Sequence, residues 1–464
     1  MISLTTDLKQ LLTTDQAHYY RIIPKAVENK RIVFYAVEED LKNGKLKELE
    51  IVFGKKVALH PVSKEELQEA LSSHYLKRNT QTRNELSLSS DNFLLDLIEE
   101  AEQLHCSDIH LESYENKCRI RMRLDGKLVE RFVIPKQDYP EFVNRLKIMS
   151  NLDIAEKRLP QDGRIMIKQQ DKQFDLRVSI LPTLYGEKVV LRLLTDENSS
   201  LSIDFLGLNE SQKEVYLKSV RKPHGIILIS GPTGSGKTTT LYATLKELND
   251  NERNILTIED PVEYTLEGIN QVQLRDKIGL DYVAALRTFL RQDPDIIMVG
   301  EIRDLPTAKM AIRAALTGHL VLSTVHTNSA WGIVTRLIEM GISPYLLADT
   351  LNIAIAQRLV RLLCPHCKKP EDNLALLRSL GFDDTHQYYK AEGCEQCHRT
   401  GYQGRKAIYE MIPVDEAMRK LIKEVEQQSE MLTEGHVGTL KQSAMALFQT
   451  GKTSLEEISP YLIA

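Results

Sequence analysis

The spacing of apolar residues changes along the chain and divides it into segments of different structure. In the first segment, RIVFYAVEED (residues 31–40) has the pattern of a strand, and KEELQEALSSHYL (residues 64–76) has the spacing of an amphipathic helix. These patterns predict a small α+β module at residues 1–85. Its residues show no pattern of catalytic or metal-binding chemistry, and we expect it to serve as a docking module.

The second segment begins with NFLLDLIEEAEQLH, whose apolar residues recur at helical spacing. CRIRMRLDGKLVERFVI then alternates apolar and charged residues around Asp125-Gly126, which is a strong signal of a β-hairpin. FDLRVSILPT and EKVVLRLL predict two further strands with arginines on their faces. We therefore expect a second, smaller α+β domain at residues 90–198. Polar stretches without apolar periodicity, at residues 77–91 and 195–204, are predicted linkers.

The third segment, residues 205–464, alternates short apolar runs with long amphipathic stretches. The apolar runs are GIILISG, NILTIED, DIIMVGE and HLVLSTVH. This order is typical of βαβ units, so it predicts an α/β domain built on a mostly parallel sheet.

Composition and charge restrict what such a chain can do. It has 464 residues, of which 42% are hydrophobic and 27% charged, as expected of a globular protein with a sizeable core. The net charge of −5 argues against coating nucleic acid through bulk charge, although a local basic groove is still compatible with it. No apolar run approaches the ~18–20 residues that span a bilayer, and the start lacks the pattern of a secretory signal, so we expect a cytosolic protein.

The clearest chemical signal is the pattern G-x-x-x-x-G-K-T from Gly231 to Thr238, between a predicted strand and a predicted helix. Such a loop turns backbone N–H groups onto phosphate oxygens at a helix N-terminus. We expect Lys237 to reach the β- and γ-phosphates of ATP and the Thr238 hydroxyl to bind Mg²⁺. The predicted nucleotide-binding residues are Gly231, Pro232, Thr233, Gly234, Ser235, Gly236, Lys237, Thr238 and Thr239.

Acidic residues follow two of the predicted strands, where parallel sheets build their sites. NILTIEDPVEY ends its strand with Glu259, Asp260 and Glu263, and PDIIMVGEIRD places Glu301 two residues after its strand. Gly300 stands where many nucleotide-hydrolysing proteins have a magnesium-binding aspartate. Each acidic cluster alone is typical of a solvated loop, but the phosphate loop upstream favours a role in hydrolysis.

Two histidines, His319 and His326, flank the apolar run of TGHLVLSTVHTNSA. A single buried histidine is usually a core residue with its hydrogen bonds made within the protein. A pair at the ends of a strand in this sheet could instead sense the γ-phosphate.

The cysteines form two C-x-x-C hooks, at Cys364 and Cys367 and at Cys394 and Cys397. Six cysteines in a reducing compartment rarely form disulfides, and zinc prefers four soft ligands in a tetrahedron, so the hooks predict a structural Zn²⁺ site. His366 and His398 are alternative ligands if only three thiolates bind. Cys106 and Cys118 lack metal-like spacing and are expected to be buried and inert.

The combination of GPTGSGKT, TIEDPVEY, RQDPDIIMVGEIRD and TGHLVLSTVHTNSA closely resembles the ATPases of type IV pilus assembly and type II secretion. SDIHLE, RIRMRLDG, NLDIAEKRLPQDGRI and GEKVVLRLL extend this resemblance to residues 90–460. In that family the first four motifs are called Walker A, the Asp box, an atypical Walker B and the His box. The resemblance implies a RecA-like P-loop NTPase domain with a zinc insert at residues 360–405, preceded by a PAS-like α+β domain and an N-terminal module.

The resemblance also implies roles for individual residues. Glu259 corresponds to the glutamate that orients or activates water, and Glu301 to the glutamate that positions Mg²⁺. Family members resemble hexameric rings in which a neighbouring subunit supplies arginines, for which Arg164, Arg177 and Arg192 are the candidates, although each could instead form a strand-face salt bridge. The expected catalytic residues are Glu259, Glu301, Lys237, His326, His319, Arg164, Arg177 and Arg192.

By this resemblance we expect a homohexameric ATPase that powers pilin polymerisation. Its expected partners are an inner-membrane platform protein and a cytoplasmic protein that docks on the N-terminal domain. The tetracysteine insert resembles the assembly and secretion branch rather than retraction motors, and the short N-terminal region favours a pilus over a type II secretion pseudopilus. A pilus of the DNA-uptake kind is compatible with this expectation. A DNA-translocating motor and a nucleotide-gated assembly switch are alternatives; the composition gives no support to direct nucleic-acid binding.

Overall fold

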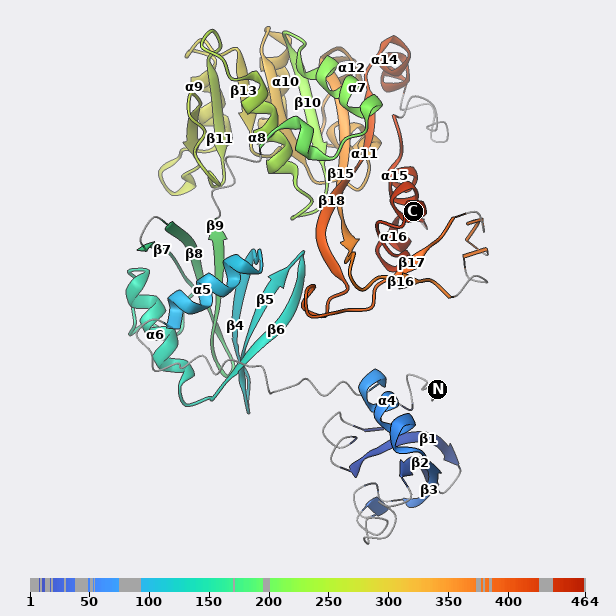
Figure 1. The fold of residues 1–464 in the computed structure, drawn as a ribbon. Coiled ribbons are helices and arrows are strands. Elements are labelled where there is room, and N and C mark those ends of the chain that lie inside the picture. The colour runs from blue at the N-terminus through green and yellow to red at the C-terminus, as the bar shows by residue number, and fades with distance from the viewer. Residues whose placement is uncertain are drawn as a thin grey trace. The chain divides into compact units, whose positions relative to one another are not determined.

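The chain divides into two compact units, Met1–Leu97 and Ile98–Ala464. Figure 1 draws them as ribbons. Of the predicted linkers, residues 77–91 and residues 195–200 lie outside the part of the chain that the structure describes, and the second linker ends in the short helix η3 (Ile203–Leu206). The computed structural model describes residues 8, 11–12, 17, 20–28, 31–37, 49–50, 53, 55–74, 93–169, 172–194, 201–372, 377–378, 380–383, 386–424 and 437–462.

The first unit is a small sheet with a helix. Its elements are β1 (Ile22–Glu28), β2 (Arg31–Val37), β3 (Lys56–Val62) and α4 (Lys64–His74). β2 pairs antiparallel with β1 and parallel with β3. Ile23, Phe34 and Leu67 are fully buried at the centre of its core, as the predicted strand and helix require.

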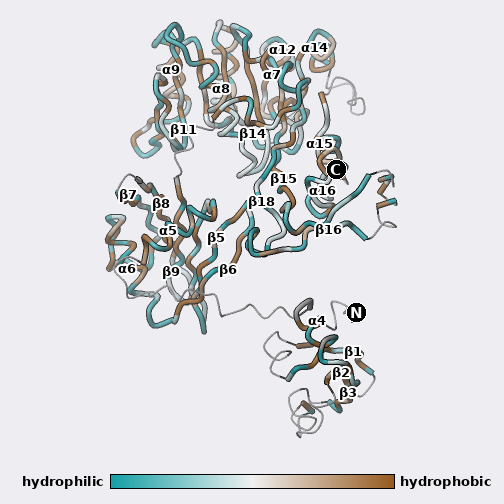
Figure 2. Tube along the Cα trace, in the orientation of Figure 1, coloured by the Kyte–Doolittle hydropathy of each residue, from teal (hydrophilic) through white to brown (hydrophobic). Residues whose placement is uncertain are grey.

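The second unit contains an antiparallel sheet with the order β6-β5-β4-β9-β8-β7. The hairpin predicted at Asp125-Gly126 is confirmed, because both residues have positive φ and Leu124 pairs with Lys127. In Figure 2, helices α5 and α6 alternate between hydrophilic and hydrophobic segments, as amphipathic helices do. The elements are α5 (Phe93–Gln103), β4 (Asp108–Ser113), β5 (Cys118–Leu124), β6 (Lys127–Ile134), α6 (Tyr139–Met149), β7 (Gln161–Gln169), β8 (Lys172–Thr183) and β9 (Gly186–Leu194).

The same unit contains a seven-stranded sheet that includes all four strands predicted in the third segment. Its strands are β10 (Gly225–Ser230), β11 (Ile255–Glu259), β12 (Asn270–Gln273), β13 (Ile296–Val299), β14 (Leu320–Val325), β15 (Leu351–Leu363) and β18 (Tyr402–Pro413). Their order is β12-β11-β13-β14-β10-β15-β18, and every neighbouring pair is parallel except β15 and β18. The predicted mostly parallel sheet is confirmed.

Helices cover both faces of this sheet (Figure 1). Ile226 and Leu228 of β10 pack into a core with α9, α10, α11 and α12, whereas Ile227 and Ile229 pack into a second core with α7 and α8. A central strand buried on both faces explains the continuous apolar run of its sequence. The remaining elements are η3 (Ile203–Leu206), α7 (Glu210–Val220), α8 (Lys237–Leu248), η4 (Asp276–Ile278), α9 (Tyr282–Phe289), α10 (Leu305–Leu316), α11 (Ala330–Glu339), α12 (Pro344–Thr350), β16 (Lys369–Pro370), β17 (Tyr389–Lys390), α14 (Glu416–Lys423), α15 (Leu440–Gln449) and α16 (Leu455–Leu462).

Candidate functional site: a phosphate loop and two strand-end glutamates

The phosphate loop connects the buried strand β10 to helix α8. At two of its glycines the φ angle is positive and neighbouring atoms leave no room for a side chain. Gly231 has a φ of 153°, and a Cβ there would lie 2.5 Å from the Gln357 carbonyl oxygen. Gly236 caps α8 with a φ of 84°, and its Cβ would lie 2.9 Å from Gln357 Nε2. Side chains at these positions would fill the cradle, so the loop presents backbone N–H groups where phosphate oxygens bind.

Lys237 opens α8 at the mouth of this loop. Its Nζ donates hydrogen bonds to the carbonyl oxygens of Gly231 (2.8 Å) and Pro232 (3.0 Å). Burial lowers the pKa of Lys237, with Arg358 acting in the same direction and Glu301 opposing it. The Ser235 hydroxyl is buried without a hydrogen-bond partner among the described residues. A cation bonded to two loop carbonyls and a hydroxyl without a partner in the described part of the chain are both suited to bind an anion.

Glu259 ends β11 and is held by three donors on a side chain only 4% exposed. Thr257 Oγ1 and Gln271 Nε2 donate to its Oε1 at 2.6 and 3.1 Å, and the Tyr242 hydroxyl donates to its Oε2. Burial raises the pKa of Glu259, while these three hydrogen bonds favour the carboxylate and Glu263 adds repulsion. The result is an oriented carboxylate with an increased affinity for a proton.

Glu301 follows β13, the neighbour of β11. Its carboxylate is paired with Arg303, and its Oε2 lies 3.2 Å from His326 Nε2. The glycine before it has little room: a Cβ on Gly300 would lie 3.2 Å from Tyr282 Oη and 3.3 Å from the Ile258 carbonyl oxygen. A side chain at this position would be tight against both neighbours, and the carboxylate of this segment stands one residue later, at Glu301.

A cavity of about 530 Å³ brings these groups together. The residues that line it include ten that the sequence predicted for the site: Thr233, Gly234, Gly236, Lys237, Thr238, Thr239, Glu259, Glu301, His326 and Arg192. A second cavity of about 780 Å³ shares Gly236, Thr239 and Arg405 with the first, and is also lined by Phe205 and by residues of the second cysteine hook. Both cavities are thus lined by residues at the start of α8.

The two predicted histidines lie at opposite ends of β14. His326 is at the carboxyl end and lines the cavity beside Glu301. His319 is at the other end, where its Nδ1 lies 2.9 Å from the carbonyl oxygen of Ala314 in α10. The structure therefore brings His326 to the cavity and places His319 at the opposite edge of the sheet.

The three predicted arginines are all ion-paired, each in a different place. Arg192 Nε lies 2.9 Å from Asp108 Oδ1, and the residue lines the cavity from β9. Arg177 bonds the Val262 carbonyl (2.6 Å) and Glu263 (2.9 Å), just beyond Glu259. Arg164 is exposed and pairs with Asp175, a diagonal neighbour on the adjacent strand β8.

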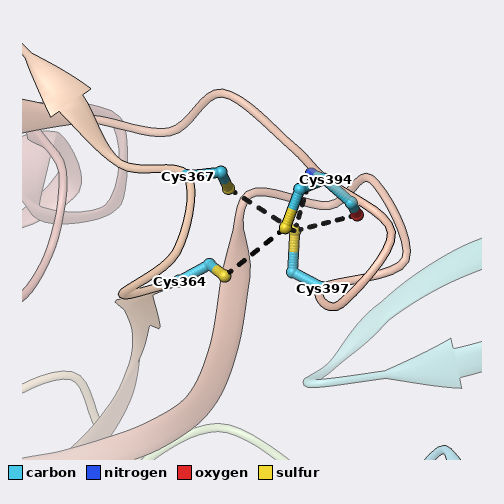
Figure 3. A group of neighbouring side chains, drawn as sticks. All are labelled: Cys364, Cys367, Cys394 and Cys397. Atoms are coloured by element: carbon cyan, nitrogen blue, oxygen red, sulfur yellow. Dashed lines mark hydrogen bonds between the residues drawn. The ribbon is translucent and has the colours of Figure 1, made fainter.

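The two cysteine hooks come together where strands β15 and β18 end their pairing (Figure 3). The sulfur atoms of Cys364, Cys367, Cys394 and Cys397 all lie within 4.8 Å of one another. Burial opposes ionisation of Cys397, but the N–H groups of Cys394 and Gly401 donate to its sulfur and lower its pKa to about 7. Four convergent thiols with N–H donors fit a closed tetrahedral Zn²⁺ site, and neither His366 nor His398 belongs to the group.

Several residues of the site were not predicted from the sequence. Tyr242 lies one helical turn after Thr238 on α8, and this i, i+4 spacing was a usable signal. Gln271 reaches Glu259 from the edge strand β12, which pairs with β11. Arg405 of β18 lines both cavities. The positions of Gln271 and Arg405 depend on strand order and register, which cannot be read from a local sequence pattern.

The fold and the phosphate loop together define a P-loop α/β protein of the RecA-like class. The chain belongs to the type II/IV secretion system protein family, whose model matches residues 87–460. Type II secretion system protein E of Aeromonas hydrophila is 42% identical over an alignment of 449 residues that covers 89% of each chain. The type IV pilus assembly ATPase PilB of Myxococcus xanthus is 46% identical over an alignment of 397 residues that covers 82% of this chain and 70% of that protein.

Solved structures resemble about four-fifths of the chain. The crystal structure of the pilus retraction motor PilT with bound ADP aligns with a TM-score of 0.53 at 26% identity, covering 79% of this chain and 96% of that one. The ATPase DotB of Legionella pneumophila aligns with a TM-score of 0.60 at 20% identity, covering 80% and 95%, and supports the fold alone. Among the described residues, no helix is long and apolar enough to cross a membrane.

Proposed function

We propose that this protein hydrolyses ATP and uses the energy to assemble a filament of pilin-like subunits. The observation that carries the proposal is the single cavity that combines Lys237 and Thr238 of the phosphate loop with Glu259 and Glu301 from two adjacent strands. The names of the relatives, several of which are called ATPases, support it.

In this proposal the phosphate loop holds the triphosphate, and Lys237 exchanges its bonds to loop carbonyls for bonds to phosphate oxygens. Thr238 and Glu301 offer the oxygen ligands that Mg²⁺ prefers and would hold this ion, whose charge offsets that of the phosphates. His326 fixes the Glu301 carboxylate through its Nε2. The larger cavity beyond Thr239 accommodates the remainder of the nucleotide.

Glu259 is the proposed acceptor of the proton from the attacking water. Its pKa, raised by burial, is closer to neutral pH than that of an exposed glutamate, as general-base catalysis requires. Thr257, Gln271 and Tyr242 fix its orientation.

Arginines complete the proposed site. Arg192, which lines the cavity from the same chain, would offset charge that develops on the transferred phosphoryl group. Arg177 positions the segment after Glu259 through Val262 and Glu263. In a homohexameric ring, exposed residues such as Arg164 would be accessible to a neighbouring subunit.

We further propose that the ring works at the cytoplasmic face of the inner membrane, bound to a platform protein there and to a docking protein through residues 1–85. Assembly of a type IV pilus is our first assignment. Assembly of a type II secretion pseudopilus is the second, because the secretion relative from Aeromonas hydrophila covers 89% of both chains.

ATP turnover by the purified full-length chain tests the enzymatic part. Lys237→Ala should reduce turnover to background, and unchanged turnover would refute the assignment. A strain in which the gene is deleted and complemented tests the cellular part. Loss of surface pili supports the first assignment, whereas loss of protein secretion with pili retained supports the second.

A further inference from the structure

Tyr282 contributes to the nucleotide cavity a hydroxyl group that the proposed function does not use. It is the first residue of α9, and it lines the cavity together with Glu259 and Glu301. Its ring packs against the core on one face of the seven-stranded sheet. The Asp281 side chain accepts a hydrogen bond from the N–H of Ala284 and so caps the helix. The cap and the packing of the ring hold the hydroxyl at a defined place in the cavity.

The hydroxyl lies beside the point where a side chain on Gly300 would begin. A Cβ on Gly300 would be 3.2 Å from Tyr282 Oη, which is nearer to it than the backbone of Ile258 or Glu259. Gly300 is itself fixed, because its N–H donates to the Ile258 carbonyl oxygen and its carbonyl oxygen accepts from Thr324 Oγ1, both at 2.8 Å. Many nucleotide-hydrolysing proteins have a magnesium-binding aspartate at this position. In this chain the phenol hydroxyl is the polar side-chain group that stands next to it.

The Tyr282 hydroxyl makes no hydrogen bond to any residue that the structure describes. Burial raises the pKa of Tyr282, and the charges of Glu301 and Asp260 raise it further, while Arg303 acts in the opposite direction. The group is therefore a neutral phenol at neutral pH, with one proton to donate and lone pairs that can accept. A polar group that faces a ligand cavity and has no partner in the described protein is available to a ligand.

The charges around the hydroxyl favour a hydrated cation over an anion. Glu301 and Asp260 act on the hydroxyl electrostatically and line the same cavity, as does Glu259 at the end of β11. Carboxylates repel phosphate oxygens and attract a cation, whereas Lys237 and the phosphate loop attract the phosphates. Mg²⁺ prefers carboxylate, carbonyl and water oxygens and keeps several of its waters, whose protons the ion makes more acidic. The Tyr282 oxygen suits such a water as a hydrogen-bond acceptor.

We propose that the Tyr282 hydroxyl binds a water molecule in the coordination shell of Mg²⁺ and so helps to hold the ion in the nucleotide cavity. This inference rests on the proposed hydrolysis of ATP and adds a positioning residue to its site. Thr238 and Glu301 offer oxygen ligands to the ion itself, whereas Tyr282 acts on it through the water. A chain with glycine at position 300 would in this way keep a polar contact to the hydrated ion.

Metal binding by Tyr282→Phe tests the proposal, because this substitution removes the oxygen and keeps the ring. The full-length protein is titrated with Mn²⁺, a paramagnetic substitute for Mg²⁺, in the presence of the nonhydrolysable ATP analogue adenylyl imidodiphosphate, and free Mn²⁺ is measured by electron paramagnetic resonance. Loss of one hydrogen bond should weaken Mn²⁺ binding roughly three- to tenfold. Affinity for the analogue in excess chelator, without metal, should not change. ATP turnover should fall at limiting Mg²⁺ and recover as Mg²⁺ approaches saturation.

The matched control is Tyr345→Phe, which removes a hydroxyl from a tyrosine of α12 that is 63% exposed and lines neither cavity. It should bind Mn²⁺ and the analogue like the wild type.

Wild-type affinity for Mn²⁺ in Tyr282→Phe would overturn the proposal. A lower kcat at saturating Mg²⁺ with unchanged Mn²⁺ affinity would also overturn it and would assign the hydroxyl to the attacking water. Weaker binding of the analogue without metal would overturn it in favour of a direct contact to phosphate. If the wild type itself bound no Mn²⁺ with the analogue, the proposed hydrolysis would fail as well, so the two failures are distinguishable.

Discussion

Replacing Tyr242 by phenylalanine removes one of the three donors to the Glu259 carboxylate and leaves the ring in place. A hydrogen bond to a charged group contributes about 1.5–3 kcal/mol. One pKa unit corresponds to 1.36 kcal/mol, so the pKa of Glu259, already raised by burial, should rise further by about 1–2 units. If Glu259 must be ionised to accept a proton, the acid limb of kcat/KM moves to higher pH by the same amount.

The assay is the pH dependence of kcat/KM for ATP hydrolysis, with the free energy of unfolding measured alongside. The folded-state pKa of Glu259 lies above its unfolded value, so this group favours folding more at acidic pH and loses that contribution as pH rises through the folded pKa. Tyr242→Phe should therefore cost most stability near neutral pH and less where Glu259 is protonated. The control is Tyr216→Phe. It removes a buried hydrogen bond between Tyr216 of α7 and Thr244 of α8, the helix that also carries Tyr242, and it should not move the acid limb. An acid limb unmoved in Tyr242→Phe would refute Glu259 as the titrating base.

Three further predictions concern other parts of the site. Gly300→Ala should cost about 1–3 kcal/mol of unfolding free energy in denaturant titrations, because its Cβ would press on Tyr282; a cost near zero would contradict the steric account of this position. Cys394→Ser should bind less zinc by metal analysis and have a lower Tm, whereas a full zinc content would exclude this residue as a ligand. His326→Ala should lower kcat while His319→Ala should affect stability alone, and equal losses of kcat would contradict their placement at opposite ends of β14.

Local patterns in the sequence were sufficient for the elements of the site. Apolar runs predicted β10, β11, β13 and β14, and the glycine pattern predicted the loop before Lys237. The carboxyl ends of parallel strands share one edge, so Glu259 and Glu301 could be expected near the loop. The register of β11 with β13, which pairs Ile258 with Val299, accounts for their proximity in detail.

The remainder depends on contacts between residues that are distant in the sequence. Gln271 reaches Glu259 only because β12 forms the edge of the sheet beside β11. The alternation of apolar and charged residues predicted that Arg164 lies on a strand face. It could not tell whether that face borders a cavity or an acidic residue of the neighbouring strand, and in the structure Arg164 pairs with Asp175. For His319 the direction of the chain was a usable signal. Only the carboxyl end of a parallel strand lies at the sheet edge with the phosphate loop, and His319 precedes the amino end of β14.

The segment after β13 has Gly300 where many nucleotide-hydrolysing proteins have a magnesium-binding aspartate, and the space around Gly300 is limited. A side chain there would be tight against Tyr282 and the β11 backbone, and the two carboxylates stand at the next residue and at the end of the adjacent strand. The site is thus divided between two strands.

Magnesium-dependent ATP turnover by Glu259→Gln and Glu301→Gln, each compared with the wild type, tests this two-strand arrangement most directly. Both substitutions keep the side-chain shape and remove the carboxylate charge. General-base and metal-ligand roles predict losses of roughly 10²–10⁴-fold in kcat for each variant, with the folded state retained. Turnover within a few-fold of the wild type in either variant would contradict the assignment of that glutamate and with it the proposed site.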